Sequence, residues 1–174
     1  EATLASGIVA TLLDLARPQS LRLGDVDVAA LAIDSMRRLE HIDAFRGIAW
    51  NNRSEVRAAL VRGDEARLRQ VMTNLLTNAA QAAAPTGRVE LRIEEYSTVV
   101  RLTVDDSGPG ISEEARTKLT EPFYTTKAEG IGLGLSIVQA VVEAHHGTVH
   151  FERSALGGAL VRVELPAMAR GGAT

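Results

Sequence analysis

The segment between Asp64 and Gly87 constrains the fold of this chain most strongly, because it predicts a single long amphipathic helix. Asp64 is a suitable N-cap for a helix that begins near residue 65, and Pro85 and Gly87 end the helical pattern near residue 83. Apolar residues recur on one face of this helix: Leu68, Val71, Met72, Leu75, Leu76 and Ala79. A helix with such a face must pack against a second layer, which the neighbouring segments have to supply.

The neighbouring segments predict that the second layer is a sheet. Short runs bounded by turn residues predict strands at residues 44–51, 56–62, 88–95, 99–105, 148–153 and 159–165. Two further helices are predicted at residues 28–41 and 132–146, the second closed by Gly147 as a left-handed cap. Because the strands come in adjacent pairs, we expect an α/β (α+β) two-layer sandwich with a mixed, mostly antiparallel sheet of about five strands and about three helices on one face.

Composition and charge exclude several classes of function. The chain has 174 residues and no cysteine, which excludes disulfides and thiolate metal sites. A net charge of -3 gives no reason to expect nucleic acid as a partner. No apolar run reaches the roughly 18 residues that a membrane span needs, and no signal peptide is visible. We therefore expect a cytoplasmic domain without membrane contact, while an anchor elsewhere in the parent protein stays open.

The first residues predict a helix over 1–17. Its apolar stripe is formed by Leu4, Ile8, Leu12 and Leu15, and Pro18 ends it. The helix either folds back onto the domain or is the end of a longer helix whose partners lie elsewhere. Because the chain starts at Glu1, we expect a piece of a longer protein. The expected division is a helical stub at 1–18, a linker at 19–24, the main domain at 25–166 and a disordered tail at 167–174.

Two short segments carry candidate ligands for a phosphorylated molecule. Asn74 and Asn78 lie on one face of the long helix, and an amide oxygen is a neutral, hard ligand suited to Mg²⁺. Asp106 ends a predicted strand and is followed by Gly108 and Gly110, which let the backbone approach a ligand closely. Its carboxylate can accept a hydrogen bond from an exocyclic amine. Alternatively, the amides only cap neighbouring backbone and Asp106 only caps a tight turn.

Two further segments could bind phosphates. Residues 121–127 show no helical or strand period and predict an ordered loop, in which Lys127 is either a point charge for a phosphate or an ordinary surface lysine. Residues 130–136 form a glycine string that opens into a helix, where free amides and the helix dipole attract anions. This string matches neither the dinucleotide fingerprint nor the P-loop.

In this order and spacing, the four segments resemble the histidine-kinase branch of the superfamily that also holds DNA gyrase, the heat-shock chaperone ATPase and MutL. The resemblance covers roughly residues 10–166 and is closest to nitrogen-regulation-type sensor kinases. The matched motifs are the N box at 74–79, the Asp-x-Gly-x-Gly box at 106–110, the F box at 121–127 and the second glycine box at 130–135. Residues 12–18 resemble the end of that group's dimerisation helices.

The resemblance implies binding of ATP and Mg²⁺ by a Bergerat-type fold. Asp106 would accept the adenine amino group, Asn78 would bind Mg²⁺, and Asn74 would steady the phosphates. The other residues expected at the nucleotide are Gly108, Gly110, Phe123, Thr126, Lys127, Gly130, Gly132, Leu133, Gly134 and Leu135. Phe123 would anchor a short lid between Lys127 and Gly132. No residue is assigned a certain catalytic role, since Asn74 and Lys127 would position phosphates.

The resemblance further implies a protein-histidine kinase that lacks its phosphoacceptor. None of His41, His145, His146 and His150 has the family's acceptor context. The γ-phosphate would therefore go to a histidine on a dimerisation domain of the same kinase, a homodimer when complete, and from there to a response regulator. One departure concerns the last hairpin, where Leu160 is interpreted as replacing a threonine that helps to bind adenine, at a cost of roughly 1 kcal/mol.

Three alternatives stay open. An ATPase module of the gyrase or MutL type would need a glutamate as general base at the position of Asn74. A regulatory domain that binds nucleotide without catalysis could lose residues of these motifs. All four motifs are intact here, which disfavours this alternative. An anti-sigma serine kinase is disfavoured by the kinase-like residues 10–18.

Overall fold

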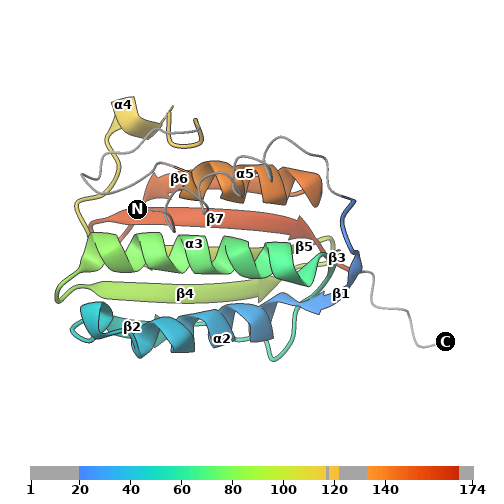
Figure 1. Cartoon of the computed structure of the whole chain (residues 1–174), viewed down its shortest axis with the longest axis horizontal. Helices are drawn as coiled ribbons and strands as arrows, with labels where there is room; N and C mark the ends of the chain where they lie inside the picture. The colour runs from blue at the N-terminus through green and yellow to red at the C-terminus, as the bar shows by residue number, and fades with distance from the viewer. Residues whose placement is uncertain (1–19, 117, 122–132, 169–174) are drawn as a thin grey trace, which may run out of the picture.

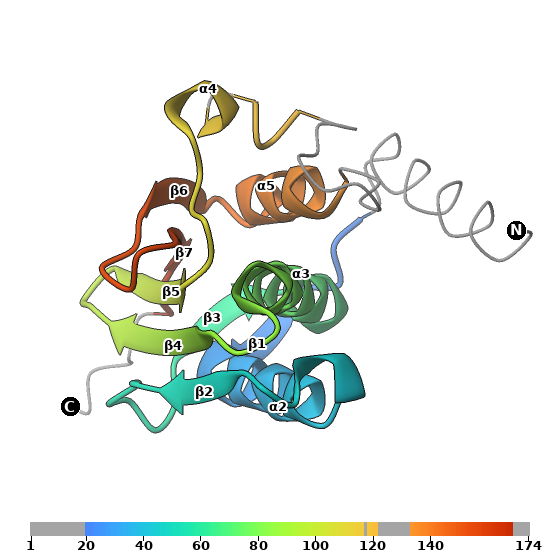
Figure 2. The same cartoon turned by 90° about the vertical axis from the view of Figure 1, so that its left-hand side faces the viewer.

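The computed structural model describes residues 20–116, 118–121 and 133–168 and consists of two layers (Figures 1 and 2). One layer is a five-stranded sheet and the other holds three helices, which lie side by side on one face of that sheet. The expected two-layer sandwich is therefore confirmed. The predicted helix at 1–17 lies outside the described residues, so the proposed division of the chain stays a prediction.

The helical layer has α3 at its centre. Helix α3 (Glu65–Ala83) packs between α2 (Val28–Glu40) and α5 (Gly134–Ala144), and α4 (Glu113–Arg116) is a short helix above them (Figure 1). The N-cap predicted for α3 is confirmed, because Oδ1 of Asp64 accepts a hydrogen bond from the backbone N–H of Arg67 at 3.2 Å.

The sheet has the strand order β2-β4-β5-β7-β6. Its strands are β2 (Ala49–Asn52), β4 (Arg88–Glu95), β5 (Val99–Asp106), β6 (Thr148–Arg153) and β7 (Ala159–Pro166). Pairing is antiparallel except between β2 and β4, which are parallel. The mostly antiparallel character follows from two chain reversals, β4–β5 and β6–β7, that place consecutive strands next to each other.

Two strand predictions before α3 were too long. The segment predicted as a strand at 44–51 begins with a 3-10 turn (Asp43–Phe45), and only its end forms β2. The reason is tertiary, since Phe45 is buried in the core by this turn. The strand predicted at 56–62 is confined to β3 (Leu60–Gly63), which pairs antiparallel with β1 (Gly24–Asp27), a strand that the sequence reading missed.

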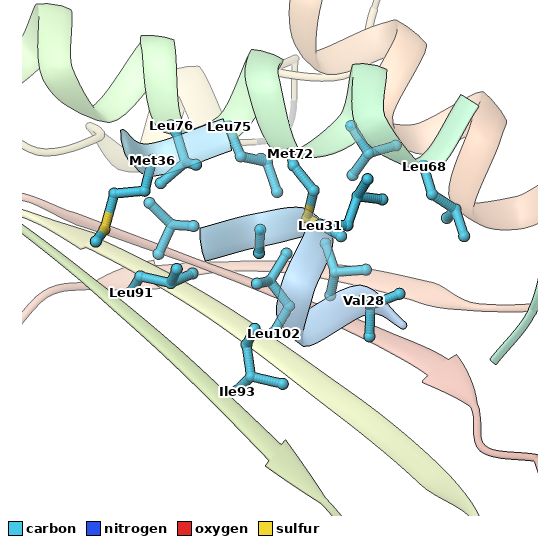
Figure 3. Close-up of a cluster of buried hydrophobic side chains, with 14 of the residues drawn as sticks. Val28, Leu31, Met36, Leu68, Met72, Leu75, Leu76, Leu91, Ile93 and Leu102 are labelled. Carbon is cyan, nitrogen blue, oxygen red and sulfur yellow. The ribbon is translucent and has the colours of Figure 1, made fainter. Parts of the chain in front are cut away.

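The core lies between α3 and the sheet and is almost wholly aliphatic (Figure 3). Its largest fully buried side chains include Leu68, Met72, Leu75 and Leu76 of α3 and Leu91 and Ile93 of β4. Each such side chain contributes about 1.5–3 kcal/mol by leaving water, so this interface holds α3 firmly on the sheet. Among the described helices, none is long and apolar enough to cross a membrane.

The C-terminal end of α5 corrects the prediction for Gly147. The left-handed residue is His146, with φ of 59°, and not Gly147. His146 N–H donates to the Glu143 carbonyl and Gly147 N–H to the Val142 carbonyl, both at 2.9 Å, which is a Schellman arrangement. Gly147 is required for another reason, because a Cβ there would collide with the carbonyl of Glu164 on β7.

Candidate functional site

The end of strand β5 places one buried carboxylate at the centre of the candidate site. Asp106 is only 5% exposed. Its Oδ1 accepts hydrogen bonds from the backbone N–H groups of Gly108, at 2.8 Å, and Ala159, at 3.2 Å, while its carbonyl accepts one from Gly158 at 3.2 Å. The bonds from Gly108 and Ala159 end on the same carboxylate oxygen and hold the carboxylate in one orientation.

Three glycines make this arrangement possible. A Cβ on Gly158 would collide with the carboxylate and the carbonyl of Asp106, and a Cβ on Gly108 would lie 2.6 Å from the Ala82 carbonyl oxygen at the end of α3. Gly110 has φ of +77°, a conformation that side chains with a Cβ rarely adopt. Gly108 and Gly110 are therefore needed for the packing and conformation of the turn itself. Their predicted role in letting the backbone approach a ligand stays a prediction.

The neighbouring acidic residue has a different environment. Successive side chains of a strand alternate between the two faces, so Asp105 points away from the helices while Asp106 points toward them. Burial raises the pKa of Asp105, and Glu90 and Glu152 add to this shift, although a hydrogen bond with Ser154 opposes it. Only Asp106, of these two carboxylates, therefore lies on the side of α3 and α5.

The two asparagines of α3 lie next to the beginning of α5. Nδ2 of Asn74 donates to the Gly134 carbonyl oxygen at 3.2 Å. A Cβ built on Gly134 would be 3.5 Å from Nδ2 of Asn78, so this amide also borders the start of α5. The structure thus brings together three residues, Asn74, Asn78 and Gly134, that the sequence singled out in two separate motifs.

The residues around the start of α5 are held by packing. Leu133 is 6% exposed and immediately precedes the helix, and its carbonyl accepts a hydrogen bond from the Ser136 hydroxyl at 2.9 Å. Leu135 is half-buried against the core. Their side chains therefore serve the fold, and any contact with a ligand would come from their backbone amides.

Several predicted site residues lie outside the described residues: Phe123, Thr126, Lys127, Gly130 and Gly132. Their expected contacts with a nucleotide stay predictions. The described part of the site consists of the Asp106 turn and the Asn74–Asn78 face, and α3 links the two because the Ala82 carbonyl near its end borders Gly108.

The role assigned to Leu160 in the sequence reading was wrong. Leu160 pairs with Asp105, and its side chain lies on the same outer face of the sheet as that residue. The residue beside Asp106 is Ala159, which is 9% exposed and donates its N–H to the carboxylate. Gly158 and Ala159 were not predicted as site residues, although the adjacent glycines at 157–158 are a signal in the sequence that could have indicated a close approach of backbone.

Comparison with known proteins assigns the family. The profile described as "Histidine kinase-, DNA gyrase B-, and HSP90-like ATPase" matches residues 63–169, which are more than half of the chain. The chain therefore belongs to this family, as its motifs predicted. The finer likeness to nitrogen-regulation-type kinases stays a prediction.

Individual relatives are sensor histidine kinases. ZraS of Klebsiella oxytoca is 34% identical over 95% of this chain and 36% of its own length, so the chain spans about a third of this curated relative. The solved structure of ThkA in complex with response regulator TrrA has a TM-score of 0.81, with 28% identity over 98% of this chain and 49% of that one. Full-length ShkA in complex with AMPPNP has a TM-score of 0.77, with 30% identity over 94% of this chain and 36% of that one.

Proposed function

We propose that this chain is the ATP- and Mg²⁺-binding catalytic domain of a two-component sensor histidine kinase. It donates the γ-phosphate of ATP to a histidine on a dimerisation domain of the same kinase. The observation that carries this proposal is the buried carboxylate of Asp106, which two backbone N–H groups orient at the edge of the helical layer. A carboxylate held in this way can accept a hydrogen bond from the exocyclic amine of adenine and reject a base that lacks one.

The described residues fit a nucleotide with its metal ion. Asn78 offers an amide oxygen, a hard and neutral ligand that Mg²⁺ accepts alongside phosphate oxygens. It borders the start of α5, where the backbone amides and the helix dipole favour negative charge. Bound there, Mg²⁺ would neutralise phosphate charge, and this chain's own residues would orient the nucleotide between Asp106 and α5.

Three of the chain's four histidines support an acceptor supplied by another domain. His145 is 5% exposed and both of its ring nitrogens face backbone groups of this domain. Nδ1 of His41 lies 2.7 Å from the Arg37 carbonyl on a surface helix, and His150 lies on the outer face of the sheet, away from α3 and α5. None of these three histidines is placed to receive a phosphate from a nucleotide at Asp106.

The geometry of Asn74 disfavours the ATPase alternative. Water activation needs a side chain that accepts a proton, and an amide cannot do so. In addition, the amide of Asn74 donates to the Gly134 carbonyl and is committed to holding α5. Phosphoryl transfer to a histidine, which needs positioning more than a general base in this domain, fits these residues better than hydrolysis.

One relative supports a proposal about the partner of the whole protein. Because ThkA has been solved in complex with a response regulator, we propose that a response regulator receives the phosphate from the acceptor histidine. We also propose that the complete protein is a homodimer and that this domain works in the cytoplasm, where its ATP is available.

Transfer to an acceptor supplied in trans tests this function. The chain is mixed with labelled ATP, Mg²⁺ and the separately produced dimerisation domain of its parent protein. The expected result is acid-labile label on the acceptor domain, none on the chain alone, and none with the acceptor histidine replaced by glutamine. Steady release of inorganic phosphate without label on the acceptor would instead favour an ATPase.

A further inference from the structure

The buried His145 at the end of α5 makes two backbone contacts that define its chemical state. Nδ1 lies 2.7 Å from the Val141 carbonyl oxygen, which can only accept, and Nε2 lies 2.9 Å from the backbone nitrogen of Asp64, which can only donate. Nδ1 therefore carries the proton and Nε2 offers its lone pair. The imidazole is therefore the Nδ1-protonated tautomer, and it connects the end of α5 with the beginning of α3.

The surroundings of His145 leave little room for another arrangement. A Cβ on Gly63 would lie 3.0 Å from Cδ2 of His145 and 2.6 Å from Cδ1 of the fully buried Leu68. The left-handed His146 and the bond from Gly147 N–H to the Val142 carbonyl end the helix directly after His145. Packing and helix termination thus place the ring at the start of α3.

Asp64 connects this bridge to the segment that precedes β1. Its Oδ2 accepts a hydrogen bond from the backbone N–H of Arg22 at 2.9 Å, and its Oδ1 caps α3. Burial alone would raise the pKa of Asp64, but the hydrogen bonds from Arg22, Arg67 and Ala66 outweigh it and hold that pKa below its ordinary value. Asp64 therefore forms hydrogen bonds with the preceding segment, with the first turn of α3 and with His145.

Helix α5 is consequently tied to α3 at both ends. The Asn74 amide holds the Gly134 carbonyl at one end, and His145 holds Asp64 at the other. The eleven residues of α5 span roughly 16 Å and behave as a rod, so a tilt at His145 displaces the end at Gly134. We infer that His145 is a positioning residue, which sets the phosphate-binding end of α5 and couples it through Asp64 to the segment at Arg22. The inference rests on the proposed function, because it assigns phosphates to that end.

Binding of two ligands separates positioning from a merely structural role. His145→Phe keeps an aromatic ring, somewhat larger than imidazole, but loses both hydrogen bonds, whereas His145→Gln retains a donor and an acceptor. For the folded Phe variant we expect roughly tenfold weaker binding of a non-hydrolysable Mg·ATP analogue, with adenosine affinity unchanged, and recovery of most of this loss in the Gln variant. Equal weakening for both ligands, or wild-type affinity for both, would overturn the inference.

A nucleotide-free measurement tests the coupling independently. Arg22→Pro removes the N–H that Asp64 accepts, and Arg22→Ala keeps it as a matched control. The readout is the resonance of the Gly134 amide in ¹⁵N-resolved NMR spectra. We expect Arg22→Pro alone to shift this resonance and Arg22→Ala to leave it unchanged. When Arg22→Pro is combined with His145→Phe, we expect no further shift relative to His145→Phe alone. A Gly134 amide that responds identically with and without His145 would overturn the coupling. If the wild-type chain binds no nucleotide, the proposed function fails, and this second measurement alone decides the inference.

Discussion

Replacement of Gly158 by alanine tests how the Asp106 carboxylate is held. The new Cβ would collide with the carboxylate and the carbonyl of Asp106 and would lie 2.5 Å from the backbone nitrogen of Gly108. Two of these three atoms are backbone, so a change of rotamer cannot relieve the overlap. The turn has to open, and the hydrogen bonds from Gly108 and Ala159 to the carboxylate, together with the one from residue 158, are weakened or lost.

The expected loss follows from these bonds. Breaking a hydrogen bond to a buried charged group costs about 1.5–3 kcal/mol, so loss of the two bonds to the carboxylate should lower the free energy of unfolding of Gly158→Ala by about 3–6 kcal/mol. At a urea dependence of about 2 kcal/mol per molar, the urea midpoint of unfolding falls by roughly 1.5–3 M. Urea unfolding followed by far-ultraviolet circular dichroism measures this shift.

Gly24→Ala is the matched control for that experiment. Nothing lies within 4 Å of a Cβ built on Gly24, and its φ is not positive. This substitution should therefore leave stability unchanged or raise it by up to about 1 kcal/mol through the unfolded chain. If Gly158→Ala is as stable as the control variant, the backbone around Gly158 does not hold the Asp106 carboxylate in the way proposed here.

Three further substitutions have defined outcomes. Asn78→Ala should weaken nucleotide binding at least roughly tenfold in Mg²⁺ and little in its absence, as calorimetry would show; equal Mg²⁺ dependence in both forms would reject the ligand role. His146→Gly should raise the free energy of unfolding by about 0.5–1 kcal/mol, because His146 has φ of 59°; a loss of stability in urea would contradict this. Asp105→Asn should stabilise the fold at pH 7 by less than about 1 kcal/mol. Burial, Glu90 and Glu152 raise the pKa of Asp105 in the folded state above 3.8. The free energy of unfolding of the wild-type chain therefore falls as the pH rises from 3.8 to that raised pKa. In urea titrations at pH values below this interval, the stability advantage of the variant should vanish.

The sequence predicted those elements whose signals are local. Helix α3 was predicted with its correct ends because an N-cap, a continuous apolar face and a Pro-Gly stop agree at Asp64 and after Ala83. Strands β4, β5, β6 and β7 were predicted because tight turns separate alternating runs. Strand β1 was missed, since its four residues are stabilised only by pairing with distant β3.

The candidate site was predictable only in part. The motifs around Asn74, Asn78 and Asp106 could be recognised because their residue types and spacing carry chemistry. The hydrogen bonds from the backbone N–H groups of Gly158 and Ala159 to Asp106 could not be predicted, because they depend on the register between β5 and β7. A shift by one residue exchanges the two faces of a strand, and the family pattern that suggested Leu160 did not show that this residue lies on the outer face.

The proposed function depends above all on recognition of the adenine of a Mg²⁺-bound nucleotide by Asp106. Calorimetric titration of the chain with a non-hydrolysable ATP analogue, with and without Mg²⁺, tests it most directly, and Asp106→Asn is the matched variant because it keeps the shape of the side chain. We expect micromolar binding by the wild-type chain that is lost in the folded Asp106→Asn variant. The same dissociation constant in both forms, or no binding by the wild-type chain up to millimolar nucleotide, would contradict it.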